Sequence, residues 1–263
     1  MKLQAKKSLG QHFLNSPHVL SQIIDAGEIK NGEEILEIGP GTGILTRSLL
    51  DSGAKVTAVE KDDRAIAILS EKFKVEMEKG RLKLINGDIL AENNDFVPQN
   101  PYKIVANIPY YITGAILEKF LEGSKRPSKM VLLVQKEVAD RILARDGKES
   151  VLSVSVKAFG VPKMVAKVPK GAFLPPPSVD SAILVIENIN ATTFEQNSIN
   201  IPSFFKIVKA GFAHKRKFLQ RNLEIVTSME NLKNIWVGLK LDEKIRAEDM
   251  TLDKWILLTK EIK

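Results

Sequence analysis

The chain has 263 residues, enough for one large domain or for a large domain and a small one. Hydrophobic residues make up 44% and charged residues 27%, ordinary values for a globular protein that argue against a disordered tail or a fibre. Cysteine is absent, which excludes a disulfide scaffold, a thiolate zinc site and a cysteine nucleophile.

The hydropathy pattern gives no sign of a membrane segment. The longest aliphatic runs, such as residues 131–134, have four residues, whereas a transmembrane helix needs about 20. The N-terminal stretch is polar and basic without the apolar run of a secretory signal. We therefore expect a cytoplasmic protein with no membrane partner.

The formal net charge of +7 is concentrated at the two ends of the chain. Residues 1–17 carry three basic and no acidic side chains, and residues 187–263 carry 13 basic and 10 acidic ones. Residues 18–186, with 23 basic and 22 acidic side chains, are almost neutral. Basic ends on a neutral body fit a polyanionic partner such as nucleic acid. They fit equally well a surface charge that only keeps the protein in solution.

Strand-like and helix-like segments alternate along the first two thirds of the chain. A helix is expected to start at Ser16 and Pro17, with proline in its first turn, and to stop at Gly27. Strands are expected over residues 34–38, 55–60, 82–86, 103–106 and 130–135, and helices over about 43–52, after Asp62, and over about 113–121 and 137–144. Apolar strands that alternate with helices predict a parallel sheet covered on both faces.

The alternation stops near residue 160. Residues 161–168 and 179–186 have the pattern of two consecutive strands joined by a proline-rich segment, which predicts an antiparallel hairpin at the sheet edge. Residues 188–201 are polar, as in a linker, and the pattern beyond Pro202 is helical. The sequence therefore predicts an α/β domain over residues 1–187 and a small helical domain over residues 188–263.

A glycine-rich turn, Glu37–Gly43, follows the first apolar strand and opens a helix. Its glycines, Gly39, Gly41 and Gly43, allow a sharp turn and the close approach of a ligand to the backbone. The spacing does not match the dinucleotide fingerprint, and the Lys-Ser/Thr pair of a phosphate-binding loop is missing. The turn either binds a ligand or only connects strand to helix.

Two acidic residues lie at or just beyond the ends of the next predicted strands. Glu60 comes 21 residues after Gly39, a distance at which a carboxylate can accept hydrogen bonds from both hydroxyls of a ribose. Asp88 follows the third strand and can accept from the exocyclic amine of a purine. Each acid alone is more often a solvated loop residue or a helix cap. Together, at the same edge of a parallel sheet, they indicate a nucleoside site.

The segment Asn107–Tyr110 lies at another strand end. The Asn107 amide oxygen and the Pro109 carbonyl can both accept from one amino group, and the Tyr110 ring can stack on a planar base. A strand-ending turn with a buried tyrosine is the competing interpretation.

Several segments together resemble a known family. Residues 37–43 are similar to the cofactor loop of class I S-adenosylmethionine-dependent methyltransferases, and Asn107–Tyr110 looks like the catalytic tetrapeptide of amino-methyltransferases that act on adenine. The segments that match the rRNA adenine dimethyltransferase family, with its small-subunit branch favoured, are Leu9–Leu14, Phe173–Ser181 and Phe204–Leu219. The resemblance covers nearly the whole chain and implies a Rossmann-like methyltransferase sheet.

The resemblance also implies a cofactor and a set of site residues. The cofactor would be S-adenosylmethionine, leaving as S-adenosylhomocysteine, with no metal. The implied cofactor contacts are His12, Leu14, Gly39, Gly41, Glu60, Asp88 and Asn107. The residues implied to hold the target adenine are Asn107, Pro109, Tyr110 and Phe173, and the two rings would sandwich a base that has left its stack.

Two residues depart from the family pattern. His12 stands where many bacterial members have Asn, which leaves open whether its side chain or its backbone contacts the cofactor. Ile108 stands where the small-subunit branch usually has Leu. Ile at this position is commoner in the Erm branch, which methylates large-subunit rRNA.

The implied chemistry is a direct methyl transfer to an adenine amine. The 6-amino nitrogen is a poor nucleophile because its lone pair is delocalised into the ring. Acceptors at Asn107 and Pro109 would bind its hydrogens and localise that lone pair in line with the methyl group. Positioning of this kind can contribute roughly 7–11 kcal/mol. The three histidines have no metal-ligand spacing.

The helical tail supplies a candidate RNA-binding surface. No acidic residue interrupts its basic residues, which are Lys206, Lys209, Lys215, Arg216, Lys217 and Arg221. Apolar residues between them would pack one helix face, and the basic face would contact phosphates. A merely solvated helix face is the alternative.

The leading hypothesis is an enzyme that dimethylates two adjacent adenines in the 3′-terminal hairpin loop of small-subunit (16S) rRNA during ribosome biogenesis. We expect it to act as a monomer on the pre-small ribosomal subunit. The alternatives are an Erm-type large-subunit rRNA methyltransferase and a ribosome-assembly factor that acts mainly by binding. The intact Asn107–Tyr110 motif argues against a catalytically inactive binder.

Overall fold

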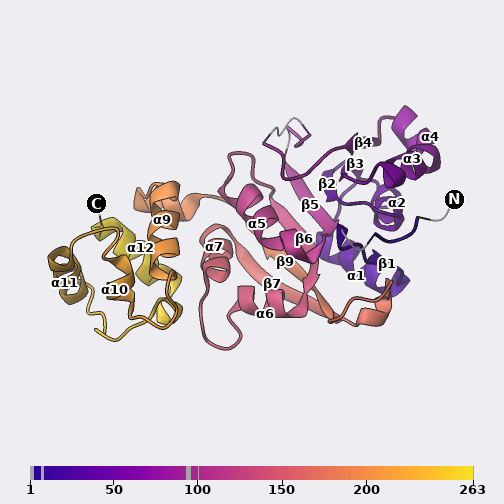
Figure 1. The fold of residues 1–263 in the computed structure, drawn as a ribbon. Helices are drawn as coiled ribbons and strands as arrows, with labels where there is room; N and C mark the ends of the chain where they lie inside the picture. The colour runs from indigo at the N-terminus through magenta and orange to yellow at the C-terminus, as the bar shows by residue number, and fades with distance from the viewer. Residues whose placement is uncertain (1–2, 7–8, 93–95, 100, 263) are drawn as a thin grey trace. The chain divides into compact units, whose positions relative to one another are not determined.

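The computed structural model of the chain describes residues 3–6, 9–92, 96–99 and 101–262. It consists of two compact units (Figure 1), the first formed by Met1–Ala139 and Pro162–Ile189 and the second by Asp140–Val161 and Asn190–Lys263. This division differs from the one expected from the sequence, because residues 140–161 group with the C-terminal helices. The Phe159 ring explains the difference, since it packs 5.0 Å from Phe194 and 6.0 Å from Phe205, ring centre to ring centre.

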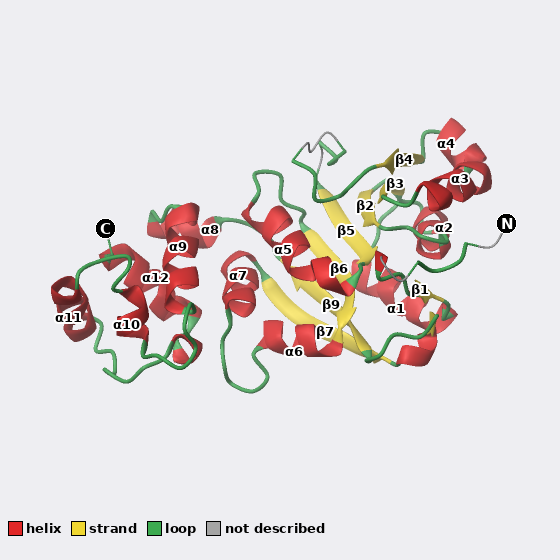
Figure 2. Ribbon diagram, in the orientation of Figure 1, coloured by secondary structure: helices red, strands yellow, loops and turns green. Residues whose placement is uncertain are grey.

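The first unit is built on a mixed β-sheet (Figure 2) with the strand order β4-β3-β2-β5-β6-β9-β7. The strands are β2 (Glu34–Ile38), β3 (Lys55–Glu60), β4 (Leu82–Asn86), β5 (Tyr102–Asn107), β6 (Lys129–Gln135), β7 (Val161–Val168) and β9 (Ser181–Glu187). The pairs from β4 to β6 are parallel, whereas β9 runs antiparallel to β6. The predicted mostly parallel sheet with an antiparallel edge is confirmed.

A separate two-stranded sheet joins the N-terminal segment to the proline-rich one. Strand β1 (Phe13–Leu14) pairs antiparallel with β8 (Phe173–Leu174), so that Phe13 lies opposite Leu174 and Leu14 opposite Phe173. The sequence pattern did not predict these strands, because two residues are too few to show alternation. Their pairing brings two of the family-like segments side by side.

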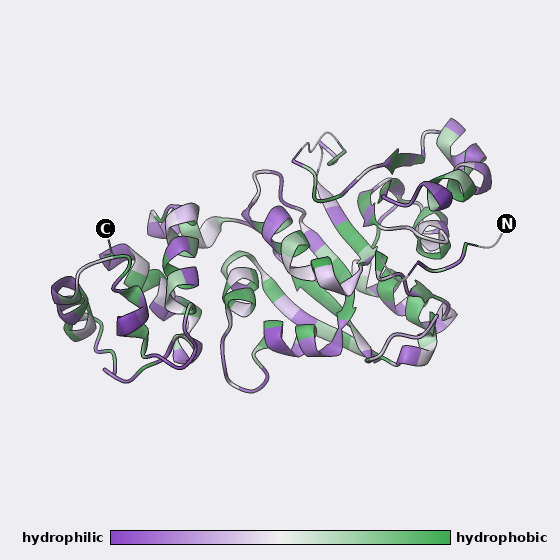
Figure 3. Ribbon diagram, in the orientation of Figure 1, coloured by the Kyte–Doolittle hydropathy of each residue, from purple (hydrophilic) through white to green (hydrophobic). Residues whose placement is uncertain are grey.

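Helices flank the sheet of the first unit. They are α1 (Pro17–Gly27), α2 (Ile44–Asp51), α3 (Asp63–Lys72), α4 (Lys74–Glu78), α5 (Thr113–Glu122) and the first half of α6 (Lys136–Leu143), with the short 3-10 turns η2 (Tyr110–Ile112) and η3 (Lys170–Ala172). Helices α1, α2 and α3 bury Ile23, Leu49 and Leu69 in one core with alternate strand residues. The apolar strands stand out in green in Figure 3. The side chain of Ser16 caps α1 and that of Asp62 caps α3, as expected for short polar residues at helix starts.

The second unit is helical. Its elements are α7 (Val151–Phe159), α8 (Thr192–Asn197), α9 (Ile201–Gly211), α10 (Leu219–Leu223), α11 (Met229–Gly238), η4 (Ala247–Asp249) and α12 (Leu252–Glu261). Helix α8 lies within the segment that was expected to be a linker. This helix packs onto the unit because its Phe194 is buried against Phe204 and Phe205. Gly211 lies so close to Trp255 that a Cβ there would stand 2.4 Å from the indole. In the part of the chain that the structure describes, no helix has both the length and the apolar character to cross a membrane.

Candidate functional site

The glycine turn joins β2 to α2, and all three of its glycines have positive φ angles, between 55° and 72°. Such angles strain any residue with a side chain, which accounts for glycine at these positions. A Cβ on Gly43 would lie 2.6 Å from Leu69 and Phe73, so this glycine is needed for packing. A Cβ on Gly39 would meet no protein atom within 4 Å. The turn therefore packs tightly at one end and is open to a ligand at the other.

Glu60 ends β3 and is fixed by backbone donors. Its Oε2 accepts from the Gly41 N–H at 3.0 Å, and its Oε1 accepts from the N–H groups of Lys61 and Asp62, each at 2.9 Å. The side chain is buried. The carboxylate is thus held in place. Its Oε1 already accepts two hydrogen bonds, whereas Oε2 accepts one and keeps a lone pair for a further donor.

Asp88 lies just beyond β4 and pairs with a residue that the sequence analysis had not singled out. Its Oδ2 accepts from Lys61 Nζ at 2.7 Å and its Oδ1 from the Leu90 N–H at 2.9 Å. The hydrogen bond from Lys61 is the main reason that the pKa of Asp88 is lowered. Both side chains are substantially exposed, so this ion pair can open at little energetic cost.

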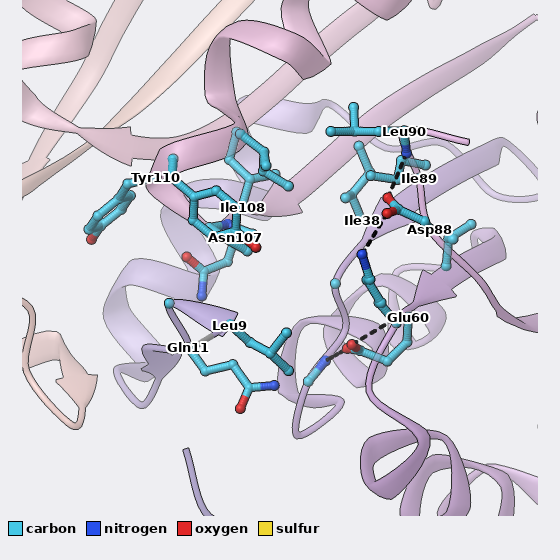
Figure 4. Close-up of a pocket in the computed structure, with 18 of the residues that line it drawn as sticks. Leu9, Gln11, Ile38, Glu60, Asp88, Ile89, Leu90, Asn107, Ile108 and Tyr110 are labelled. Carbon is cyan, nitrogen blue, oxygen red and sulfur yellow. Dashed lines mark hydrogen bonds and ion pairs between the residues drawn. The ribbon is translucent and has the colours of Figure 1, made fainter. Parts of the chain in front are cut away.

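These residues surround a cavity of about 310 Å³. Eight of the predicted site residues line it, namely His12, Gly39, Gly41, Glu60, Asp88, Asn107, Pro109 and Tyr110. Figure 4 shows the Glu60 and Asp88 side chains on one side of the cavity and Asn107 with Tyr110 on the other. The order of strands β4, β3, β2 and β5 explains this, because it brings their carboxyl ends together at one edge of the sheet.

Asn107 ends β5 with its amide oriented by a neighbouring segment. Its Nδ2 donates to the backbone carbonyl of His12 at 3.0 Å. Asn107 lines the cavity, and its Oδ1 has no hydrogen-bond partner among the described residues, so it remains available as an acceptor. The next residue, Ile108, is buried and also lines the cavity.

Tyr110 is fixed from two directions. Its hydroxyl lies 2.6 Å from Ser181 Oγ, and its ring stacks on His12 with 6.0 Å between ring centres and 20° between planes. Burial is the main cause of the raised pKa of its phenol. The His12 ring is held in turn, because its Nδ1 lies 2.9 Å from the Pro175 carbonyl oxygen. The Pro109 carbonyl, a predicted acceptor, already accepts from the Ile112 N–H at 3.2 Å.

Two predicted site residues do not line the cavity. Leu14 and Phe173, opposite each other in the β1–β8 pair, are only 4% and 3% exposed and belong to the hydrophobic core. In this structure the Phe173 ring packs among apolar side chains, so a sandwich of a base between it and Tyr110 would need a movement of the ring.

One buried acid of the glycine turn was not singled out as a site residue. Glu37 is 1% exposed, and neither oxygen of its carboxyl group has a hydrogen-bond partner among the described residues. Burial raises the pKa of this group to about 8. The sequence shows only that Glu37 stands at the start of the turn. A sequence pattern cannot show that a glutamate is buried without a hydrogen-bond partner.

The six predicted RNA-binding residues belong to the second unit and are exposed. Lys206 and Lys209 lie on α9, Arg221 lies on α10, and Lys215–Lys217 form part of the loop between them. The buried Asn222 shapes that loop, because its Nδ2 donates to the carbonyls of Gly211 at 2.6 Å and His214 at 3.1 Å. Of the three basic residues at the N-terminus, Lys2 and Lys7 lie outside the described residues.

Among the described residues, no group of three or more His, Asp or Glu side chains is placed to hold a metal ion. The cavity is instead lined by fixed oxygen acceptors, by glycines and by half-buried aromatic rings. This donor set suits a nucleoside-like ligand, and it leaves an amide acceptor, Asn107, on the opposite wall.

Comparison with known proteins finds relatives that are similar over nearly the whole chain. A protein of Dehalococcoides mccartyi (strain BAV1) named ribosomal RNA small subunit methyltransferase A is 42% identical over 257 residues, which cover 96% of this chain and 87% of that protein. A protein of the same name from Thermosynechococcus vestitus is 38% identical over 269 residues, covering 99% and 98% of the two chains.

Solved structures are similar over nearly the full chain. A dimethyladenosine transferase from Plasmodium falciparum has a TM-score of 0.76 and 27% identity, covering 94% of this chain and 96% of its own. The 23S rRNA methyltransferase ErmE has a TM-score of 0.71 and 25% identity, covering 95% and 99%. The model of the ribosomal RNA adenine dimethylase family matches residues 2–263. The chain belongs to the ribosomal RNA adenine dimethylase family.

Proposed function

We propose that this protein transfers methyl groups from S-adenosylmethionine to the 6-amino groups of two adjacent adenines in the 3′-terminal hairpin loop of small-subunit rRNA. Family membership and the names of the relatives support an rRNA adenine dimethyltransferase. The observation that carries the proposal is the oriented Asn107 amide, which presents an acceptor to the cavity opposite the two carboxylates.

The cavity fits the proposed cofactor. Glu60, fixed by three backbone N–H groups, would accept from the ribose hydroxyls, and Asp88 from the adenine amine. Gly39 leaves open space where a side chain would stand, and Gly41 lines the cavity beside it. When bound, the cofactor supplies an electrophilic methyl group on a sulfonium. The chain's residues then have only to place an amine nitrogen in line with it.

Asn107 is the residue that we assign to the reacting amine. Its Oδ1 would accept one amino hydrogen, and the Pro109 carbonyl, which keeps a second lone pair beside its bond to Ile112, would accept the other. Two acceptors on the hydrogens favour a pyramidal nitrogen with a localised lone pair. The Tyr110 ring, held by Ser181 and His12, would stack on the base and orient that lone pair. This is catalysis by positioning.

The His12 contact with the cofactor is proposed to be a backbone contact. In this structure the His12 carbonyl accepts a hydrogen bond from Asn107. The His12 ring contacts the Pro175 carbonyl and stacks on Tyr110, so this side chain already has partners within the protein. Leu14 and Phe173 would support the site from the core beneath it. A stacking role for Phe173 requires its ring to leave that core.

We propose that the six basic residues of the second unit bind RNA phosphates and that the protein acts as a monomer on the immature small subunit. The exposure of all six supports the phosphate contacts, as does the loop 214–217, which Asn222 of α10 holds through the carbonyls of Gly211 and His214.

A large-subunit target is the second candidate, because Ile108 fits the Erm pattern and ErmE is a structural relative. The small-subunit target is preferred on similarity, since the relatives named small subunit methyltransferase A are 37–42% identical and ErmE is 25% identical. Ile108 itself is almost fully buried, although it lines the cavity.

The test is methylation of purified, undermethylated small subunits and of large-subunit rRNA, with the modified base mapped. We expect dimethyladenosine at two adjacent positions of the small-subunit RNA. Methylation of large-subunit RNA alone would establish the Erm-type activity instead, and binding without transfer to either would favour an assembly factor.

A further inference from the structure

Tyr110 and Tyr111 are consecutive in η2, but their side chains have opposite environments. Tyr110 is half-buried, bonded to Ser181 and stacked on His12. Tyr111 is 69% exposed and nevertheless lines the same cavity. A single exposed aromatic residue is common on a protein surface. Tyr111 differs from such residues because its ring lies at the rim of the site.

The position of the Tyr111 ring is restricted by the N-terminal segment. A Cβ on Gly10 would stand 3.3 Å from Cδ1 and Cε1 of the ring, so the ring rests against a residue without a side chain. Gly10 also has a φ of +59°, which a larger residue would adopt only with strain. Tyr111 is thus backed on one side by backbone and open to solvent on the rest of its surface.

The geometry points to a specific ligand for this ring: we propose that the nucleotide next to the target adenine stacks on Tyr111. The inference rests on the proposed function. When one adenine leaves its stack to enter the cavity, its neighbour loses a stacking partner and stays outside, at the rim. An aromatic ring there replaces the lost stack whatever the base, because every base has a π-face.

Two observations favour an RNA base over the cofactor as the occupant. Glu60, which is assigned to the cofactor ribose, is 7% exposed, whereas Tyr111 is 69% exposed. Lys61, which is also exposed and lines the cavity, is paired with Asp88 here and could turn its ammonium group to a phosphate when that exposed pair opens. The proposed role needs the ring and not the hydroxyl, because a base stacks on a π-face.

The experiment compares Tyr111→Leu, which removes the ring, with Tyr111→Phe, which keeps it. Three RNAs are used: a hairpin that presents a single target adenine, and the same hairpin with an abasic nucleotide on the 5′ or the 3′ side of that adenine. RNA affinity is measured by fluorescence anisotropy at fixed salt, methyl transfer is followed as KM and kcat, and S-adenosylmethionine affinity is measured by calorimetry.

We expect Tyr111→Leu to weaken binding of the intact hairpin, and to raise its KM, by about 10-fold, the scale of one base stack. Tyr111→Phe should stay within about two-fold of the parent. On one of the two abasic hairpins the parent and Tyr111→Leu should bind equally well. Cofactor affinity should be the same in all three proteins.

Three results would overturn the inference: unchanged RNA affinity in Tyr111→Leu, an equal loss on both abasic hairpins, or weakened cofactor binding, which would assign the ring to the cofactor. The proposed function fails separately. A parent that binds the hairpin through Tyr111 but transfers no methyl group would support the stacking role and reject the methyltransferase activity on this RNA. A purely structural role would lower the thermal stability of Tyr111→Leu and would not distinguish the three RNAs.

Discussion

The backbone N–H of Gly41 donates to Glu60 Oε2 at 3.0 Å, so the glycine turn after β2 is tied directly to the carboxylate at the end of β3. The two residues are neighbours only because β2 and β3 are parallel and adjacent, with Ile38 opposite Val59 in the register. The bond fixes both the loop and the acid before any ligand arrives. Preorganisation of this kind reduces the ordering cost of binding.

This arrangement makes Glu60 a test of the cofactor site. Glu60→Ala removes the acceptor for the ribose and also releases the Gly41 N–H, so cofactor affinity should fall by about 1.5–3 kcal/mol, the scale of a charge-assisted hydrogen bond. Calorimetric titration with S-adenosylmethionine measures the change. Glu60→Gln is the matched control, since it keeps one acceptor oxygen, and we expect an intermediate loss. Unchanged affinity in Glu60→Ala would remove this residue from the site.

The sheet and half of this site follow from local sequence patterns. Apolar runs predicted the strands. The carboxyl ends of parallel strands lie at the same edge of a sheet, so the acids and the amide at those ends were predicted to lie close together. Glu60, Asp88 and Asn107 lie around one cavity for that reason. Their side-chain types then limited the ligand to one rich in hydroxyl and amine donors.

The remainder depended on contacts between distant segments. The pairing of Leu14 with Phe173 buries both residues, and no periodicity in two-residue strands reveals this. The Lys61–Asp88 ion pair and the contact of Tyr111 with Gly10 have the same origin. Helix α8 was missed because its single buried aromatic residue, Phe194, sits in an otherwise polar stretch.

The basic loop of the second unit gives a prediction for RNA binding. Replacing Lys215, Arg216 and Lys217 by Gln should lower RNA affinity and reduce the slope of log affinity against log salt by about 2–3 units, because three phosphate contacts are lost. The control removes the same charge from the exposed Lys233, Lys240 and Lys260. Equal slopes for the two triple variants would show that the loop does not contact phosphates and that only net charge matters.

Glu37 predicts a pH dependence of stability. Its pKa in the folded protein is raised to about 8 by burial, from an ordinary value of 4.5. Between these pH values the unfolded chain has lost the proton that the folded chain retains. The contribution of this group to stability is therefore fully present below about pH 4.5 and is lost as the pH rises through 8, at up to about 1.4 kcal/mol per pH unit.

Urea unfolding of the parent and of Glu37→Gln, compared from pH 5 to pH 9, measures this contribution. The amide cannot ionise, so we expect the free energy of unfolding of the parent to fall relative to that of the variant as the pH rises. A difference that stays constant over this range would mean that Glu37 does not retain a proton in the folded protein.

Asn107→Ala should slow methyl transfer far more than it weakens RNA binding. RNA affinity is expected to come from many phosphate contacts of the exposed basic residues, whereas Asn107 lines the cavity and would contact one amino group. Its acceptor matters most when the nitrogen becomes pyramidal, so its loss removes an interaction of the transition state. We expect a decrease of about 100-fold or more in the single-turnover rate, equal to roughly 2.7 kcal/mol.

Asn107→Asp separates the two roles of this side chain. The aspartate keeps an acceptor oxygen for the amine but cannot donate to the His12 carbonyl, which now accepts from Nδ2 at 3.0 Å. If acceptance from the amine is the main effect, the aspartate variant should be faster than the alanine variant, although it holds its carboxylate less well. RNA binding at fixed salt should stay within a few-fold of the parent in both variants. Transfer by Asn107→Ala at close to the parental rate would contradict the amine-acceptor role, and the positioning of the base would then have to come from Pro109 and Tyr110.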